Sequence, residues 1–194
     1  MQRRLFITGP SGSGKSALLR GLLAHRLSFA GGYVTERKLD TQGKLLGYDI
    51  MPAAAAAGVE GLERQSFLDC WVTPPRADTE VFRNYGVQLL TEAEHYPFAL
   101  LDEFGGFELL IPQFRNALSE LLNSDLPCIG VIKTQAQARD IKRRLGLGNK
   151  FTAYTRQLHT ALKADPDTLI IEMKRPGDKK AAEAIIRWIE EYIG

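Results

Sequence analysis

The sequence predicts an α/β fold: a three-layer α/β/α domain whose sheet is mainly parallel, with one antiparallel hairpin. Short apolar runs typical of buried strands recur at 4–8, 98–101, 128–132 and 168–171. Between them lie segments with apolar residues at helical spacing, and strands that alternate with amphipathic helices are typical of a parallel sheet. The 194 residues suit one domain, and no repeat or linker divides them. We therefore expect a single domain over residues 1–194.

A glycine-rich loop follows the first strand. It matches the phosphate-binding pattern G-x-x-x-x-G-K-[ST] at every fixed position, and the apolar strand before it and the helix opening at Ser16 are the context that the pattern requires. Gly12 and Gly14 let the backbone curl so that its amides face phosphates. Lys15 would add a charge at the β- and γ-phosphates, and the Ser16 hydroxyl would bind Mg²⁺. The predicted nucleotide-binding residues are Gly9, Pro10, Ser11, Gly12, Ser13, Gly14, Lys15, Ser16 and Ala17.

The next segment predicts an antiparallel hairpin. Residues 31–35 lead into one strand, residues 45–51 form its partner, and residues 41–44 are the turn between them. Four further elements are expected in order: a helical turn or loop at 53–57, a strand at 67–72, a break at 73–75 and a helix at 79–94 that Gly86 weakens.

The second half alternates strands and helices. After the strand at 98–101, a helix presents the apolar residues Phe107, Leu110, Ile111, Phe114, Leu118, Leu121 and Leu122, with Pro112 near its first turn. A strand at 128–132, a basic helical region and a strand at 168–171 follow. The last helix has its apolar face at Ala182, Ile185, Ile186, Ile189 and Ile193. Trp188 lies just off that face, and we expect Trp71 and Trp188 to be packing residues.

Two carboxylates close the strand at 98–101. An aspartate at the end of an apolar strand is the usual partner of Mg²⁺ in proteins with a phosphate-binding loop, which assigns Asp102 to the metal. Glu103, next to it, is placed to orient and deprotonate a water in line with the γ-phosphate, so we predict Lys15 and Glu103 as catalytic residues. The alternative is that both carboxylates only cap the helix that starts near Gly106.

These motifs occur in one order that resembles a known family. The loop at 9–16, the segments 32–36 and 43–48, and above all residues 101–109 with Phe114 after them are similar to the small P-loop nucleoside-triphosphatases. That family includes cancer-related nucleoside-triphosphatase and its archaeal and bacterial relatives, and the resemblance covers roughly residues 3–133. It implies a P-loop NTPase domain that hydrolyses several nucleoside triphosphates with Mg²⁺ and with little base preference.

The resemblance also implies roles for individual residues. Lys15 and Ser16 would act at the phosphates and the metal, Asp102 at the metal, and Glu103 at the attacking water. The chain departs from the family pattern at Gly106 and Phe107, where the family usually has lysine and methionine. The family's hairpin arginine corresponds to Arg37 or Lys38, and residues 134–166 have no clear counterpart.

The segment 133–166 is strongly basic: residues 133–163 hold eight lysines and arginines against one acidic residue, Asp140. One interpretation is a lid or insertion whose arginine reaches the γ-phosphate, or a patch for an acidic partner or RNA. The interpretation that we favour is that Arg143 and Arg144 end a solvated helix before Gly146, where cations complement the helix dipole.

Other residues allow a structural and a functional interpretation. Three histidines lack metal-binding spacing and are expected at the surface or in caps: His25, His95 and His159. Glu108 either touches the water shell of a metal or complements a helix dipole. Tyr33, Tyr48 or another aromatic residue is a candidate to stack on the nucleotide base, and the sequence does not choose between them.

Composition narrows the partners and the location. A net charge of +2 gives no bulk attraction to nucleic acid or to an anionic membrane, so we expect neither as a partner. No apolar stretch reaches the roughly 18 residues of a membrane span, and the N-terminal run is too short for a signal peptide. Cys70 and Cys128 form no C-x-x-C pair, and we expect them to be buried or incidental thiols in a protein of a reducing compartment. We expect a cytoplasmic protein, and the sequence identifies no protein partner.

Three functions are compatible with these observations. The first is a Mg²⁺-dependent nucleoside-triphosphatase, which the carboxylates Asp102 and Glu103 favour because they suit water activation. The second is a nucleotide or small-molecule kinase with a basic lid, although a kinase must exclude water from the γ-phosphate. The third is a nucleotide-switched adaptor with slow turnover.

Overall fold

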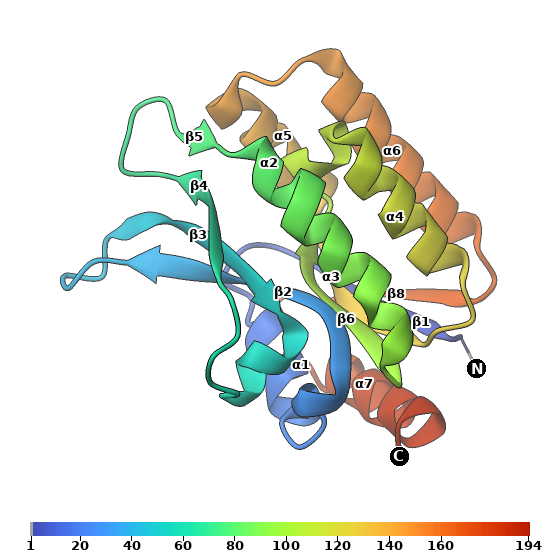
Figure 1. Ribbon diagram of the computed structural model, residues 1–194. Helices are drawn as coiled ribbons and strands as arrows, with labels where there is room; N and C mark the ends of the chain where they lie inside the picture. The colour runs from blue at the N-terminus through green and yellow to red at the C-terminus, as the bar shows by residue number, and fades with distance from the viewer. Residues whose placement is uncertain (1) are drawn as a thin grey trace.

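A single eight-stranded sheet runs through the computed structural model, which describes residues 2–194 (Figure 1). The strand order is β5-β4-β3-β2-β6-β7-β1-β8. The strands from β2 to β8 in this order pair in parallel, and β3, β4 and β5 extend the sheet in antiparallel fashion. The predicted mainly parallel sheet with an antiparallel hairpin is confirmed.

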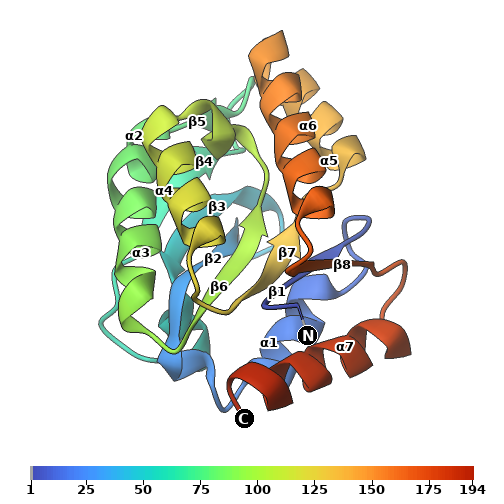
Figure 2. The ribbon, with the colours of Figure 1, turned by 90° about the vertical axis from the view of Figure 1, so that its right-hand side faces the viewer.

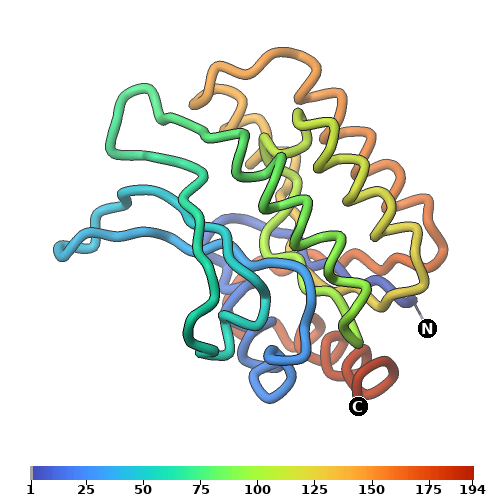
Figure 3. Tube along the Cα trace, viewed as in Figure 1, coloured from blue at the N-terminus to red at the C-terminus, as the bar shows by residue number. Residues whose placement is uncertain are grey.

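The strands are β1 (Arg4–Thr8), β2 (Ala30–Leu39), β3 (Leu45–Pro52), β4 (Gln65–Asp69), β5 (Arg76–Ala77), β6 (Phe98–Phe104), β7 (Cys128–Ile132) and β8 (Thr168–Glu172). The α-helices are α1 (Lys15–Leu23), α2 (Thr79–Val81), α3 (Val87–Thr91), α4 (Pro112–Asn123), α5 (Gln135–Leu145), α6 (Asn149–Ala164) and α7 (Lys179–Tyr192). Short 3₁₀ turns occupy Leu27–Phe29, Ala53–Ala57, Glu92–His95 and Phe107–Leu110, and a π-helical turn occupies Phe82–Gly86. The loop between β2 and β3 projects beyond the rest of the chain (Figure 3).

Helices cover both faces of the sheet and complete the three layers (Figure 2). Helices α1 and α7 lie on one face, and α2 to α6 lie on the other. The buried apolar residues form two clusters, one on each face. Because each layer buries its apolar side against the sheet, the sheet is fixed between two cores.

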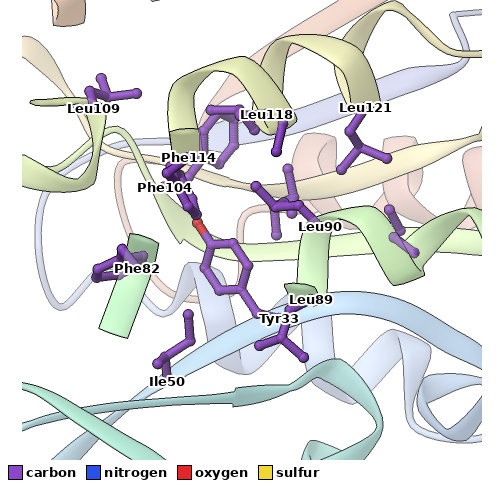
Figure 4. Packing of buried hydrophobic residues seen from close by; sticks show 14 of the residues in the cluster. Tyr33, Ile50, Phe82, Leu89, Leu90, Phe104, Leu109, Phe114, Leu118 and Leu121 are labelled. Carbon is purple, nitrogen blue, oxygen red and sulfur yellow. The ribbon is translucent and has the colours of Figure 1, made fainter. Parts of the chain in front are cut away.

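The larger core contains a set of aromatic rings around Phe82 and Phe114 (Figure 4). Tyr33 is fully buried among them, with its ring centroid 6.5 Å from that of Phe82 and 6.1 Å from that of Phe114. Tyr48 packs partly against the same core, 6.2 Å from Phe67. The hypothesis that Tyr33 stacks on a nucleotide base is therefore wrong, because its ring is enclosed by the core.

The region from 53 to 95 shows where the sequence prediction was imprecise. Residues 53–57 form a 3₁₀ turn, and the strand expected at 67–72 lies at 65–69. Trp71 then falls in a loop with 65% of its surface exposed, so the prediction that it is a packing residue is wrong. The helix expected at 79–94 exists but passes through a π-helical turn that ends at Gly86.

Close packing explains why residue 86 is a glycine. A β-carbon at this position would lie 2.9 Å from the Phe82 ring and 3.1 Å from the Phe114 ring. The missing side chain lets this helical segment approach α4 closely.

Two further helices differ in detail from the expectation. The segment after β6 is a 3₁₀ turn followed by α4, which begins at Pro112 as the position of that proline predicts. In α7 the buried face is rotated relative to the predicted one, because Trp188 is 2% exposed whereas Ile186 is 42% exposed. The Trp188 indole N–H donates to the Arg3 carbonyl at 3.0 Å and its ring packs on Phe98, and this large ring decides which face of α7 is buried.

We expect Gly130→Ala to destabilise the fold by about 1–3 kcal/mol, since overpacking a core costs that much. A β-carbon on Gly130 in β7 would lie 2.2 Å from the carbonyl oxygen of Leu101 in β6. The matched control is Gly21→Ala in α1, where a β-carbon meets nothing within 4 Å. It should stabilise the protein by about 0.5–1 kcal/mol, as alanine does in a helix. Urea unfolding of both variants measures the difference, and equal stabilities would contradict the prediction.

Candidate nucleotide-binding site

Three neighbouring parallel strands end at the same edge of the sheet. Strand β7 lies between β6 and β1, so the segments that follow these strands lie side by side. The glycine-rich loop follows β1, Lys133 follows β7, and Asp102 and Glu103 lie near the end of β6. The carboxyl edge of an open α/β sheet is where such proteins bind ligands.

The loop has the backbone conformation that its sequence predicts. Gly9, Gly12 and Gly14 have φ values of 144°, 80° and 82°, a region that side chains disfavour. Gly14 directly precedes α1, and no side chain caps the start of this helix. The amides at the N-terminus of α1 are therefore left for an anion, and the helix dipole favours negative charge there.

Lys15 lies inside the loop with 6% of its surface exposed. Its ammonium donates to the carbonyl oxygens of Gly9 and Pro10 at 3.1 and 2.8 Å. Burial lowers the pKa of Lys15, and the charge of Lys133 lowers it further, while Glu103 and Asp102 oppose the shift. The side chain is thus folded back onto the loop, against its carbonyl oxygens.

Asp102 connects β6 to α1. It is 1% exposed, and its Oδ1 accepts from the Ser16 hydroxyl at 2.7 Å while its Oδ2 accepts from Arg20 Nε at 2.9 Å. Arg20 also donates to Glu36 at 3.3 Å and to the Thr35 carbonyl at 3.0 Å. Burial raises the pKa of Asp102, whereas Arg20 and Ser16 lower it, and the net direction is upward.

Ser16 and Asp102 suit a magnesium ion. Both offer oxygen atoms, which Mg²⁺ prefers, and they already lie within hydrogen-bond distance of each other. Among residues 2–194 there is no cluster of three or more His, Cys, Asp or Glu that would hold a metal by itself. Mg²⁺ usually takes one or two protein ligands and completes its shell with phosphate oxygens and water.

Glu103 points to a different set of partners. Its Oε2 accepts from Lys133 Nζ at 2.9 Å, and its Oε1 lies 3.5 Å from Gln137 Nε2 at the start of α5. Burial raises the pKa of Glu103, but Lys133, Lys15 and Gln137 together hold the pKa below its usual value. Glu103 is therefore ionised and held by a cation.

Glu108 caps the turn after β6, which neither Asp102 nor Glu103 does. Its Oε1 accepts from the amides of Gly105 and Gly106 at 2.7 and 2.6 Å, and the residue is 4% exposed. The local interpretation of Glu108 is thereby favoured over contact with a metal's water shell. The capping alternative for Asp102 and Glu103 is contradicted, because both are bonded to other side chains.

Three contributors to the site were not assigned from the sequence: Arg20, Lys133 and Gln137. Arg20 lies four residues after Ser16, so the two share one face of α1, and this spacing was a usable signal. Lys133 was counted only within the basic segment, although it directly follows a buried strand. Its contact with Glu103 depends on the pairing of β6 with β7, which local sequence does not specify.

The rest of the basic segment is organised as two helices. Arg143 and Arg144 both pair with Asp140 at 2.5 and 2.7 Å, and their side chains are 80% and 67% exposed. Helix α5 ends before Gly146, which has a left-handed conformation, as predicted for this helix end. No ion pair joins either arginine to the site in the part of the chain that the structure describes.

The histidines occupy separate places. His25 and His95 are exposed, and His159 Nε2 lies 2.8 Å from the carbonyl oxygen of Lys133. Across residues 2–194, no helix is both long and apolar enough to cross a membrane.

Comparisons with known proteins agree with this geometry. A protein-family model described as NTPase matches residues 4–161. Nucleoside-triphosphatase THEP1 of Thermotoga sp. (strain RQ2) is 29% identical over 136 residues, which cover 67% of this chain and 74% of that protein. The crystal structure of THEP1 from the hyperthermophile Aquifex aeolicus matches with a TM-score of 0.63 at 17% identity, over 96% of this chain and 99% of the other. That structural likeness supports the P-loop NTPase fold.

We expect Arg20→Met to destabilise the protein by about 1–3 kcal/mol, because it leaves a buried carboxylate with one partner fewer. Without Arg20 the pKa of Asp102 should rise further above the unfolded value of about 3.9. A carboxyl pKa raised in the folded state means that stability falls as pH rises through that pKa, so the loss should be larger at pH 8 than at pH 4.

The control for Arg20→Met is Arg187→Met, which removes an exposed arginine that pairs with Glu183 on α7. It should change stability by less than about 0.5 kcal/mol at either pH. Denaturant unfolding at the two pH values measures both variants. A loss for Arg20→Met that is the same at pH 4 and pH 8 would contradict the electrostatic explanation.

Proposed function

The chain belongs to the NTPase family, and from this premise we propose that it is a Mg²⁺-dependent nucleoside-triphosphatase that releases the terminal phosphate by in-line attack of water. The homology to THEP1 supports nucleoside-triphosphatase activity in general. The dependence on Mg²⁺, the broad range of bases and the roles of individual residues are the proposal.

One observation carries the proposal: the bond of 2.7 Å between Ser16 in the loop helix and Asp102 at the end of β6. It brings the phosphate-binding loop and the two carboxylates of β6 to one place. Asp102 and Glu103 then face different partners, Ser16 for the first and Lys133 for the second. Two adjacent carboxylates with separate surroundings can divide the work between metal binding and proton transfer.

The residues of the loop bind the triphosphate. The backbone N–H groups of the loop from residue 11 to residue 17 and the Lys15 ammonium hold the β- and γ-phosphates, and Ser16 and Asp102 hold Mg²⁺. When bound, Mg²⁺ neutralises charge on the phosphate oxygens. Glu103 orients the attacking water and accepts its proton as the new phosphorus–oxygen bond forms. The bond from the γ-phosphorus to the bridging oxygen breaks, and the nucleoside diphosphate leaves with the electron pair.

The basic segment bears on the alternatives. Arg143 and Arg144 pair with Asp140 and are largely exposed, which favours our interpretation of the end of α5 as a solvated helix rather than a lid. The free thiols Cys70 and Cys128 agree with the cytoplasmic location that we propose.

Phosphate release tests the proposal directly. A malachite-green assay across ATP, GTP, CTP and UTP, with Mg²⁺ or with excess EDTA, measures activity, base preference and metal dependence together. Lys15→Ala is the control, and it should abolish release and weaken triphosphate binding more than diphosphate binding. Release that appears only with an added acceptor would indicate a kinase. Weak release that rises sharply with a protein partner would indicate an adaptor.

We expect Glu103→Gln to lower turnover by about 10²–10⁴, the usual contribution of a positioned acid–base group. Glutamine still hydrogen-bonds a water but does not accept its proton at neutral pH. Affinity for ATP with Mg²⁺ should stay within a few-fold, since other groups hold the ground state. Steady-state kinetics and equilibrium binding measure the two quantities.

Asp102→Asn is the comparison for Glu103→Gln. Its defect should be partly relieved by raising the Mg²⁺ concentration, because the interaction that it loses is with the metal. Normal turnover in Glu103→Gln would place water activation elsewhere. Loss of nucleotide binding as severe as in Lys15→Ala would make Glu103 part of the metal site.

We expect alanine at Arg143 or Arg144 to change turnover by less than about threefold, as for exposed side chains outside a site. If either arginine supplied charge to the transition state, turnover would fall by a factor on the order of 10² or more with affinity nearly intact. Single variants measured with ATP and Mg²⁺ at saturation separate the two results, and the larger loss would support the lid.

A further inference from the structure

Lys133 stands between the two halves of the site. It follows β7, whose neighbours are β1, which leads into the phosphate-binding loop, and β6, which carries the carboxylates. Its amide donates to the Phe104 carbonyl at 2.9 Å, and its carbonyl accepts from His159 Nε2 at 2.8 Å. The backbone of Lys133 is thus fixed on both sides, and only its side chain is free to change partners.

The side chain crosses a space left by a glycine. A β-carbon on Gly106 would lie 3.4 Å from Lys133 Cε and 2.6 Å from Glu108 Oε2. With no side chain at 106, the lysine stem passes over this turn and its ammonium reaches Glu103 at 2.9 Å. The lysine side chain is 19% exposed, so the cation is largely desolvated but open on one side.

Nearby carboxylates stabilise the charged form of Lys133. Burial lowers the pKa of Lys133, but Glu103, Glu108 and Asp102 together raise it above its usual value. Burial lowers the pKa of Lys15, and the charge of Lys133 lowers it further. The two ammonium groups therefore lie close enough to repel each other. Two cations in one region favour the arrival of a polyanion, because a phosphate relieves their repulsion.

The pair with Glu103 has a consequence for catalysis. A carboxylate that accepts a hydrogen bond from an ammonium at 2.9 Å has one oxygen engaged and its charge neutralised, which makes it a poor proton acceptor. For Glu103 to act on a water, Lys133 must move to another anion. The γ-phosphate that the adjacent loop would hold is an anion of higher charge than the carboxylate.

We propose that Lys133 is the γ-phosphate-sensing cation of this site: it pairs with Glu103 in the absence of triphosphate and moves to a γ-phosphate oxygen when triphosphate binds, which releases Glu103 to the attacking water. This inference rests on the proposed function. It makes a nucleoside diphosphate unable to release Glu103, since a diphosphate lacks the γ-oxygens. No covalent bond forms to Lys133, and the water proton passes to Glu103.

The experiment measures the preference for triphosphate over diphosphate. Dissociation constants are determined with Mg²⁺ for a non-hydrolysable ATP analogue and for ADP, in wild type and in Lys133→Met, which keeps the stem and removes the charge. The analogue should bind about tenfold more weakly to the variant or worse, as for the loss of one charged hydrogen bond, while ADP affinity stays within about twofold. Turnover should also fall at saturating ATP.

Two further variants separate charge from structure. Lys133→Arg restores the charge and should recover part of the preference for the analogue. Lys180→Met removes an exposed lysine on α7, across the sheet from α5 and α6, and should leave binding and turnover unchanged. Equal losses of affinity for both nucleotides in Lys133→Met, or no loss for either, would overturn the proposal.

Lys133→Met leaves Glu103 without its cation and could therefore fold poorly, so a further variant is needed for that case. The double variant Glu103→Gln with Lys133→Met removes both partners, and its reference is Glu103→Gln alone. A lower preference for the analogue in the double variant supports the proposal, and an unchanged preference overturns it. If wild type releases no phosphate from any triphosphate, the proposed hydrolysis fails, whereas the binding preference still decides the role of Lys133.

Discussion

Both carboxylate oxygens of Asp102 accept hydrogen bonds from α1, one from Ser16 and the other from Arg20. Asp102 is 1% exposed, so its ionised form depends on these two hydrogen bonds. Removing either partner would leave a buried charge incompletely compensated. The pair fixes the position of α1 relative to β6. Because α1 starts directly after the glycine-rich loop, the same contact also fixes the loop beside the carboxylates. The rest of the site is arranged around this connection.

Glu103, the next residue, is held in a different way. Asp102 is bonded to two residues one turn apart on a rigid helix, whereas Glu103 is bonded to the end of one long lysine side chain. A guanidinium or hydroxyl held by packing has little freedom, and an ammonium on a four-carbon stem can turn to another anion. The site therefore combines a fixed carboxylate, suited to a metal, with one whose partner can exchange.

The last part of the chain supports the loop, although it lies beyond residues 4–161, which match the family model. Met173 follows β8, and its amide donates to the Thr8 carbonyl at 2.8 Å. A β-carbon on Gly9 would lie 2.0 Å from the Met173 carbonyl oxygen. Gly9 is thus required by a neighbour far away in sequence as well as by its own φ of 144°. Pro176 also lies close to the loop, since a β-carbon on Gly14 would be 3.7 Å from its Cβ.

The sequence by itself determined the fold class, the loop at 9–16, and the candidates Asp102 and Glu103 at a strand end. Apolar periodicity and fixed motif spacing are local properties, and local conformation follows from them. Only the tertiary structure decided that Arg20 is the partner of Asp102 and that Lys133 is the partner of Glu103. It also decided that Tyr33 is buried. These depend on which strands become neighbours and on which face of each helix packs. Such choices are set by the summed burial of residues far apart in the chain. The local spacing of Ser16 and Arg20 indicates only that the two share one face of α1, and not which carboxylate they meet.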